Sequence, residues 1–125
     1  MRKIITSSEA PAPVGPYSQA VLVNDILYIS GQIAMDPKTG ELKNTDIKTE
    51  TIQVMENLNS ILKEAGFTFA DVIKSTIYVT DMNAFAEINN TYDRYFAGNY
   101  PARETVGVLS LPKGAKIEIS MIAGA

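Results

Sequence analysis

The sequence predicts a single α+β domain over residues 1–125, with a mixed six-stranded sheet and two helices packed on one of its faces. Two stretches repeat apolar residues at the spacing of an amphipathic helix, and six shorter stretches are rich in β-branched residues. Along the chain they run as strand, hairpin, helix, strand, helix and two strands. Hairpins combined with helical crossovers give a mixed sheet whose helices share one face. The opposite face is then uncovered, so we expect the chain to associate through it.

The N-terminal part predicts a short strand followed by a hairpin. Residues 3–7 can form the strand, and the connector over residues 10–16 is stiff because its prolines fix φ and lack an N–H group. Apolar runs at residues 20–23 and 26–30 flank Asn24-Asp25, which are residue types that tolerate positive φ. We therefore expect a hairpin with a two-residue turn.

A long amphipathic helix is predicted over residues 47–65, after a turn at residues 36–40 that contains both proline and glycine. Asp46 is a suitable N-cap, and Gly66 stands where a helix commonly ends in a left-handed residue. The apolar positions recur at threes and fours, namely Ile47, Met55, Leu58, Ile61, Leu62 and Ala65.

The third region predicts a strand and a second helix. Residues 72–79 alternate in character, so we expect Ile73, Ile77 and Val79 on the buried face. The helix is expected over about residues 84–97, where the apolar stripe is Phe85, Ile88, Tyr92 and Phe96.

The C-terminal region predicts two strands, over residues 104–109 and 116–123, joined by a turn around Pro112-Lys113-Gly114. If the turn makes a simple hairpin, Gly107 pairs near Glu118.

Composition narrows the possible chemistry. The chain has no Cys and no His, which excludes disulfides, thiolate nucleophiles and Cys-ligated zinc, and removes the commonest acid/base group at neutral pH. The formal net charge is -3, so we expect no nucleic-acid partner. No apolar run reaches the length of a signal peptide core or a membrane span, so we expect a cytoplasmic protein with no membrane partner.

Two charged residues are candidates for chemistry. Arg103 stands at the start of a predicted strand, where its planar guanidinium can bind a carboxylate bidentately. Glu118 alternates with Ile117 and Ile119, so it points away from the apolar face together with Ser120. Taken alone, the residue pattern favours an exposed surface arginine and a solvated strand carboxylate over functional roles.

Three other positions are candidates for binding. Asn89 falls within the apolar stripe of the second helix, so its amide either bonds nearby backbone or faces a polar pocket. Tyr17 follows the rigid connector and is either a core aromatic or a fixed pocket wall. Ser30-Gly31 ends a strand, which is typical of a plain turn and also of a close approach between backbone and ligand.

Several short blocks occur in order along the chain: Gly15-Pro16-Tyr17-Ser18-Gln19, Ile29-Ser30-Gly31-Gln32-Ile33, Lys74-Ser75-Thr76-Ile77-Tyr78-Val79, Asn89-Asn90-Thr91-Tyr92, Pro101-Ala102-Arg103 and Lys116-Ile117-Glu118-Ile119. Together they resemble the Rid family, also called the YjgF family, over the whole length. The resemblance implies a chorismate-mutase-like subunit, a homotrimer built around a central barrel, and ligand clefts between subunits. It also implies hydrolysis of 2-imino acids and their enamine tautomers, such as 2-aminoacrylate, 2-iminobutanoate and 2-iminopropanoate, to 2-oxo acids and ammonia without metal or organic cofactor.

The resemblance also assigns roles by position. Arg103 would hold the substrate carboxylate, and Glu118 would orient or deprotonate the attacking water. Tyr17, Asn89 and the Ser30-Gly31 backbone would line the cleft.

The chain departs from the family pattern at three positions. Many members carry a cysteine two residues after the arginine, where this chain has Thr105, so a thiol nucleophile is excluded. Glu104 stands where many members have a small residue. Alternation places the Thr105 hydroxyl on the same strand face as Arg103 and the Glu104 side chain on the opposite face. Ser120 stands where a second acid is common.

Two other functions stay open at the level of the sequence. The same cleft could bind a 2-oxo acid or another small carboxylate without turnover. An RNA-acting or chaperone-like protein is the other alternative, and the acidic balance of the chain argues against strong RNA binding.

Overall fold

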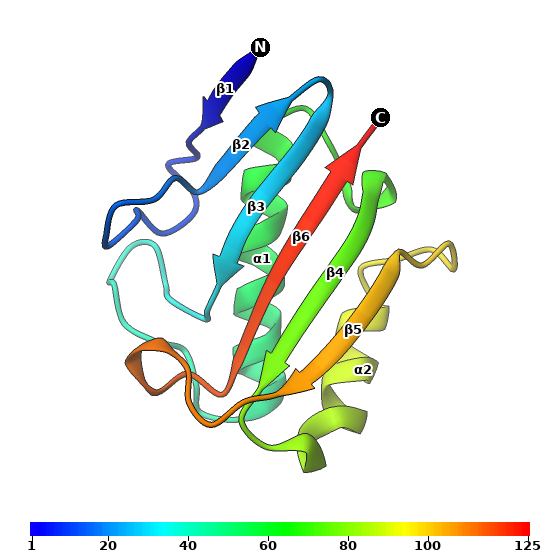
Figure 1. Ribbon diagram of the computed structural model, residues 1–125. Helices are drawn as coiled ribbons and strands as arrows, with labels where there is room; N and C mark the ends of the chain where they lie inside the picture. The colour runs from blue at the N-terminus through cyan, green and yellow to red at the C-terminus, as the bar shows by residue number, and fades with distance from the viewer.

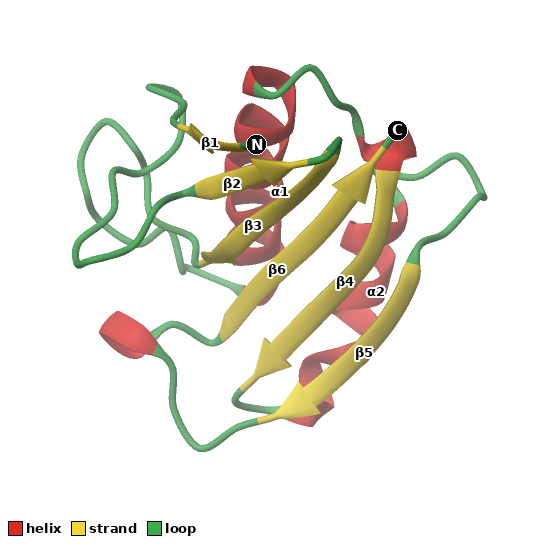
Figure 2. Cartoon of the chain, turned by 45° about the horizontal axis from the view of Figure 1, so that its top comes forward, coloured by secondary structure: helices red, strands yellow, loops and turns green.

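The computed structural model describes residues 1–125 and contains one six-stranded sheet with both α-helices on the same face (Figures 1 and 2). The strand order is β1-β2-β3-β6-β4-β5, antiparallel except for the parallel pair β4 and β5. The predicted α+β class is confirmed. The elements are β1 (Arg2–Ile5), β2 (Ala20–Val23), β3 (Ile26–Gln32), α1 (Ile47–Glu64), β4 (Val72–Val79), α2 (Phe85–Asp93), β5 (Ala102–Gly107) and β6 (Ile117–Gly124).

The β2–β3 hairpin and helix α1 agree with the predictions. Asn24 and Asp25 have φ of 48° and 66°, the left-handed values that a tight hairpin turn requires. Asp46 accepts a hydrogen bond from the Thr49 N–H at 2.7 Å and caps α1, and Gly66 follows the helix at φ 84°. The buried stripe of α1 packs on the sheet and includes Val54, Met55, Leu58, Ile61 and Leu62.

Helix α2 is shorter than the predicted span of residues 84–97. Residues 82–84 form a separate 3₁₀ turn, and α2 ends at Asp93. Beyond that point the N–H groups of Tyr95 and Phe96 bond three residues back, to Tyr92 and Asp93, instead of four. The tighter turn brings both aromatic rings against Phe69.

The last two strands do not form the expected hairpin, so that prediction is wrong. Strand β4 lies between β5 and β6, pairing in parallel with β5 and antiparallel with β6 (Figure 1). Helix α2 carries the chain from the end of β4 back to the start of β5, which is the connection that a parallel neighbour needs. Gly107 therefore pairs with Val79, and Glu118 pairs with Tyr78.

One residue of β4 faces away from the predicted side. Ile73 is 48% exposed, whereas Val72, Ile77 and Val79 are buried. The register between β4 and β6 shifts between Val72 and Lys74, so the alternation that the sequence suggests is broken at the start of the strand.

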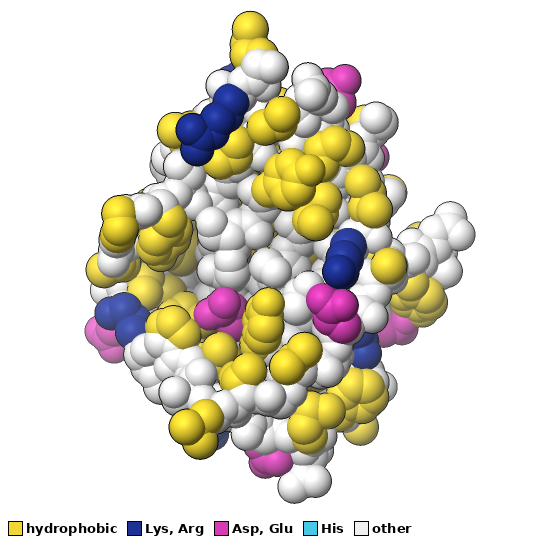
Figure 3. All heavy atoms as spheres, in the orientation of Figure 1, with side chains coloured by type: hydrophobic (Ala, Val, Ile, Leu, Met, Phe, Trp, Pro, Cys, Tyr) yellow, Lys and Arg dark blue, Asp and Glu magenta, His cyan; other side chains and the backbone are white.

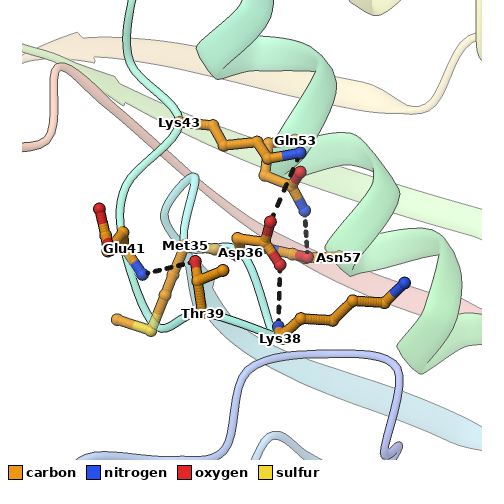
Figure 4. Close-up of polar contacts among 8 residues, drawn as sticks. All are labelled: Met35, Asp36, Lys38, Thr39, Glu41, Lys43, Gln53 and Asn57. Atoms are coloured by element: carbon orange, nitrogen blue, oxygen red, sulfur yellow. Dashed lines mark hydrogen bonds and ion pairs between the residues drawn. The ribbon is translucent and has the colours of Figure 1, made fainter.

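Buried polar side chains of α1 fix two segments of the chain. The Asn57 amide donates to the carbonyls of Ile33 and Met35 at 3.2 and 2.9 Å, and it accepts from Gln53 at 2.9 Å. Figure 4 shows this amide beside the loop in which Asp36 pairs with Lys43 at 3.4 Å. The fully buried Glu50 accepts the Lys116 N–H at 2.7 Å at the entry to β6. Helix α1 thus sets the path of the loop after β3 and the start of β6.

The sheet face opposite the helices is uncovered and carries hydrophobic side chains above β3, β4 and β6, with charged groups among them (Figure 3). Tyr28, Ile73 and Val106 are between 41% and 50% exposed on it. Glu104 also lies on this face, where it pairs with Lys74 at 3.4 Å and accepts from Thr76. Neither helix has the combination of length and apolar character that a membrane span needs.

Candidate functional site

Arg103 lies on β5 and points toward the helices. It is in register with Ser75, which is fully buried and accepts a 2.9 Å hydrogen bond from the Tyr92 hydroxyl. The guanidinium carbon of Arg103 stands 5.1 Å from the Tyr92 ring centre and 5.6 Å from that of Phe85. Two rings of α2 therefore hold the cation by cation–π contacts. No carboxylate forms an ion pair with Arg103, so its hydrogen-bonding fork is available to a ligand.

Two unpartnered polar atoms share the helix side of the sheet with Arg103. Asn89 Oδ1, from α2, and Thr105 Oγ1, from β5, are both buried and make no hydrogen bond. Buried polar groups almost always have a partner, and an unsatisfied one costs about 1–3 kcal/mol. Their exposed neighbour Glu104 points the other way, as the alternation predicted. We interpret the two free atoms as acceptor and donor positions for a polar ligand.

A cavity of about 370 Å³ opens beside Arg103 and Asn89, between the last turns of α2 and the start of β5. Its walls combine two tyrosine rings and a proline with polar side chains, of which Arg103 and Asp93 are the only charged ones. The Tyr100 hydroxyl donates to Asp93 Oδ1, and this bond together with the carboxylate charge raises the pKa of Tyr100. Burial raises the pKa of Tyr92, so the ring beneath Arg103 stays neutral. The lining residues are Asn89, Asn90, Tyr92, Asp93, Tyr100, Pro101 and Arg103.

Glu118 belongs to a second group of residues, on the uncovered face. Its carboxylate lies against Gly31, where a Cβ would come within 2.2 Å of Oε2 and 2.7 Å of Cδ. Gly31 sits at a register shift between β3 and β6, so the backbone there bends beside the acid. Burial raises the pKa of Glu118 above its usual 4.5. A carboxylate that is partly removed from water in this way is a better proton acceptor than an ordinary surface glutamate.

Ser30 precedes Gly31 in the chain, and Tyr17 lines the same cavity as Gly31. The Ser30 hydroxyl donates to the Ser18 carbonyl at 2.7 Å, and the Ser30 N–H donates to the Gln19 carbonyl at 2.9 Å. Tyr17 is 53% exposed and lines, together with Gly31, a second cavity of about 310 Å³ with mainly apolar walls. The Ser30 bonds thus fasten the segment that follows Tyr17 to the end of β3.

The Pro-rich segment before Tyr17 is held by a single buried amide. Gln19 is 2% exposed; its Oε1 accepts the Ser7 N–H at 2.7 Å, and its Nε2 donates to the carbonyls of Ser7 and Pro11 at 3.1 and 2.9 Å. Three prolines leave this segment with few N–H groups of its own, so the Gln19 bonds replace the missing backbone bonds.

The two groups of site residues are on opposite faces of the sheet. Arg103 is in register with Ser75, whereas Glu118 is in register with Tyr78, and these two β4 residues point to opposite sides. Within one chain the sheet therefore separates Arg103, Thr105 and Asn89 from Glu118. The expectation that Glu118 and Ser120 share one face agrees with this register, since both flank the buried Ile119.

Some functional features were not found by sequence reasoning. Phe85 and Tyr92 were assigned to the core stripe alone, and their contact with Arg103 depends on the parallel pairing of β5 with β4. Gln19 is an ordinary polar residue by sequence, and nothing local indicates that its buried amide bonds the Ser7 N–H and the carbonyls of Ser7 and Pro11. No group of three or more Asp or Glu side chains is arranged to hold a metal ion.

The fold and these two groups define a class of small α+β proteins with an unpaired arginine on an edge strand and an acid on the open sheet face. A family model described as "Endoribonuclease L-PSP" matches residues 7–125. The chain belongs to this family, the Rid family.

Relatives cover nearly the whole chain. A RutC family protein of Pyrococcus horikoshii is 50% identical over 123 residues, which is 98% of both chains. The 2-iminobutanoate/2-iminopropanoate deaminase of Rattus norvegicus is 49% identical over 98% of this chain and 90% of its own. Among solved structures, E. coli TdcF with bound serine has a TM-score of 0.94 at 40% identity and covers 98% of each chain.

Proposed function

We propose that this chain is an imine/enamine deaminase that hydrolyses small 2-imino acids, and the enamines that tautomerise to them, to 2-oxo acids and ammonia. The observation that carries the proposal is the unpaired Arg103 guanidinium, fixed between two rings beside the unpartnered Asn89 Oδ1 and Thr105 Oγ1. A fixed cation and two free polar atoms suit a small acid with a polar substituent next to its carboxylate. The deaminase name of the rat relative supports the same chemistry.

The site residues take complementary roles in this reaction. Arg103 binds the carboxylate, and Glu118 accepts a proton from water as the water oxygen attacks C2 of the protonated imine. The C=N π electrons move to nitrogen, which gives a carbinolamine. Glu118 then returns this proton to that nitrogen, the C–N bond breaks with its electron pair leaving on ammonia, and the hydroxyl oxygen gives its proton to Glu118 as the C–O bond becomes the carbonyl of the 2-oxo acid. Tyr17, Ser30, Gly31, Asn89 and Thr105 line the cleft.

The cleft in this proposal is shared between copies of the chain. Arg103 and Glu118 lie on opposite faces of one sheet, so a substrate that contacts both needs Arg103 from one copy and Glu118 from another. The uncovered face with its exposed Tyr28, Ile73 and Val106 supports association. We propose the homotrimer that the family resemblance implies, with three such clefts. A cytoplasmic location stays a prediction that cell fractionation tests.

The direct test couples the purified protein to a threonine dehydratase and follows the release of 2-oxobutanoate and ammonia. We expect acceleration over buffer, and an Arg103→Ala variant whose kcat/KM falls about 10- to 100-fold, because a hydrogen bond to a charged group contributes about 1.5–3 kcal/mol. Saturable 2-oxobutanoate binding without any turnover would support a non-catalytic binding protein instead.

Mixed oligomers test the shared cleft. Arg103→Ala and Glu118→Gln copies, each lacking one residue in every cleft, are co-expressed with different tags and purified as hetero-oligomers. A cleft that joins the intact Arg103 of one variant to the intact Glu118 of the other regains activity. Hetero-oligomers no more active than the two parents would refute the cleft that is shared between copies.

A further inference from the structure

Asp93 and Arg103 line the same cavity without pairing to each other. Asp93 is the last residue of α2, and Arg103 is the second residue of β5. The ion pairs of the chain join Lys43 to Asp36 and Lys74 to Glu104, and neither involves this cavity. Opposite charges that face one cavity of about 370 Å³ and remain apart leave room for a ligand that contacts both.

The Asp93 carboxylate is held in place with one oxygen free. The Tyr100 hydroxyl donates to Oδ1, and no group of the protein donates to Oδ2. The Tyr100 ring is itself braced by Phe96, at 6.3 Å between ring centres. Asp93 therefore presents an acceptor oxygen to the same cavity that the Arg103 guanidinium lines.

Within one copy of the chain, no other side chain that lines this cavity carries a negative charge. The remaining polar lining residues, Asn89 and Asn90, are neutral amides. Glu118 lies on the other face of the sheet, and Glu104 points to that face as well. Asp93 is thus the one carboxylate that the same chain places beside Arg103.

We propose that Asp93 is a specificity-determining residue that pairs with a cationic nitrogen next to the carboxylate held by Arg103. The ligands selected are 2-imino acids in their protonated iminium form, together with α-amino acid zwitterions. The corresponding 2-oxo acid carries a neutral carbonyl at that position and keeps only the contact with Arg103. This inference rests on the proposed function for the role of Arg103.

The pairing has a functional consequence for the reaction. Substrate and product differ at C2 by the charge of the group attached, so Asp93 favours the substrate over the product and aids product release. Free α-amino acids, which carry both charges, compete with the substrate for the same cavity.

The test compares two ligands with the same carbon skeleton, 2-aminobutanoate and 2-oxobutanoate, by titration calorimetry with the full-length assembled protein near neutral pH. In Asp93→Asn we expect 2-aminobutanoate to bind about five-fold more weakly, as suits an exposed ion pair, while 2-oxobutanoate changes less than about two-fold. Asparagine keeps an oxygen for the Tyr100 hydroxyl, so the local fold is retained. Asp25→Asn removes the same charge at the β2–β3 turn, where positive φ suits asparagine, and leaves both affinities unchanged.

The outcomes separate this inference from the proposed function. Equal weakening of both ligands in Asp93→Asn, or unchanged binding of 2-aminobutanoate, would overturn the specificity role. Imine hydrolysis by the unaltered protein is measured in parallel. If the protein hydrolyses imines but Asp93→Asn does not change its preference between 2-aminobutanoate and 2-oxobutanoate, only the role of Asp93 is refuted. A protein that discriminates the ligands but has no turnover refutes the deaminase proposal and supports the role of Asp93 in binding.

Discussion

Gly31→Ala is the change that tests most sharply how Glu118 is positioned. A Cβ on residue 31 would stand 2.2, 2.7 and 3.0 Å from Oε2, Cδ and Cγ of Glu118. The first two separations are far below van der Waals contact, so the carboxylate must leave its place against β3. The backbone at Gly31 is not in the left-handed region, so the effect of the alanine is steric.

The expected magnitudes follow from that displacement. Overpacking of one methyl group against a half-buried side chain destabilises a protein by about 1–3 kcal/mol. If Glu118 is the proton acceptor, moving it also removes a contribution of about 10²- to 10⁴-fold to the rate. We expect kcat to fall at least about 100-fold while 2-oxobutanoate binding through Arg103 changes little.

A double-mutant cycle gives the decisive measurement. In a Glu118→Ala background all three atoms that the new Cβ would meet are absent, so Gly31→Ala should lose most of its effect on urea unfolding. A destabilisation of the same size in both backgrounds would refute the reasoning, since the strain would then arise elsewhere. The activity assay in Glu118→Ala alone supplies the rate floor against which Gly31→Ala is compared.

Other predictions concern protonation and the loop before Tyr17. Burial raises the pKa of Glu118, so the acid limb of the kcat/KM profile should lie above pH 4.5 and vanish in Glu118→Gln; a limb at or below 4.5 would contradict the role of a buried base. Because the pKa of Glu118 is higher in the folded than in the unfolded protein, its protonated form contributes stability below the pKa of the unfolded state. That contribution is lost as pH rises through the pKa of the folded state. The free energy of urea unfolding of Glu118→Gln should therefore exceed that of the parent protein above about pH 5 and equal it near pH 3. Gln19→Ala should cost about 1–3 kcal/mol and speed amide exchange in residues 7–17 more than elsewhere; uniform exchange changes would show that the amide has no special hold on that segment.

The elements that local sequence determines were predicted well. The Asn24-Asp25 turn, the Asp46 cap and the Gly66 stop of α1 depend on the φ preferences and hydrogen-bonding groups of one or two residues. The fold class follows from the order of such elements. Helix ends were less predictable, because the last turn of α2 is decided by aromatic packing on Phe69, a residue far away in sequence.

Strand order could not be read from the sequence alone. A turn at Pro112-Lys113-Gly114 is equally compatible with a hairpin and with a loop that passes the end of β4. In the structure Lys113 adopts φ 57°, yet the strands on either side of the turn, β5 and β6, do not pair with each other. The alternation of β4 was also misleading at Ile73, where a register shift changes the face. Both errors arise from contacts between distant residues, which local patterns do not encode.

The relative positions of the site residues also depend on contacts between strands that are distant in sequence. Alternation correctly put Thr105 on the Arg103 side and Ser120 on the Glu118 side, but the relation between these sides depends on β4 lying between β5 and β6. If Arg103 and Glu118 shared a face two residues apart, they would form an ion pair and occupy the site themselves. Because the sheet keeps them apart, each must be held by its own support, Arg103 by the rings of Phe85 and Tyr92 and Glu118 by the space that Gly31 leaves. In the shared cleft that we propose, an unpaired cation of one copy and a desolvated acid of another remain free for the substrate, which is the condition that the proposed hydrolysis requires.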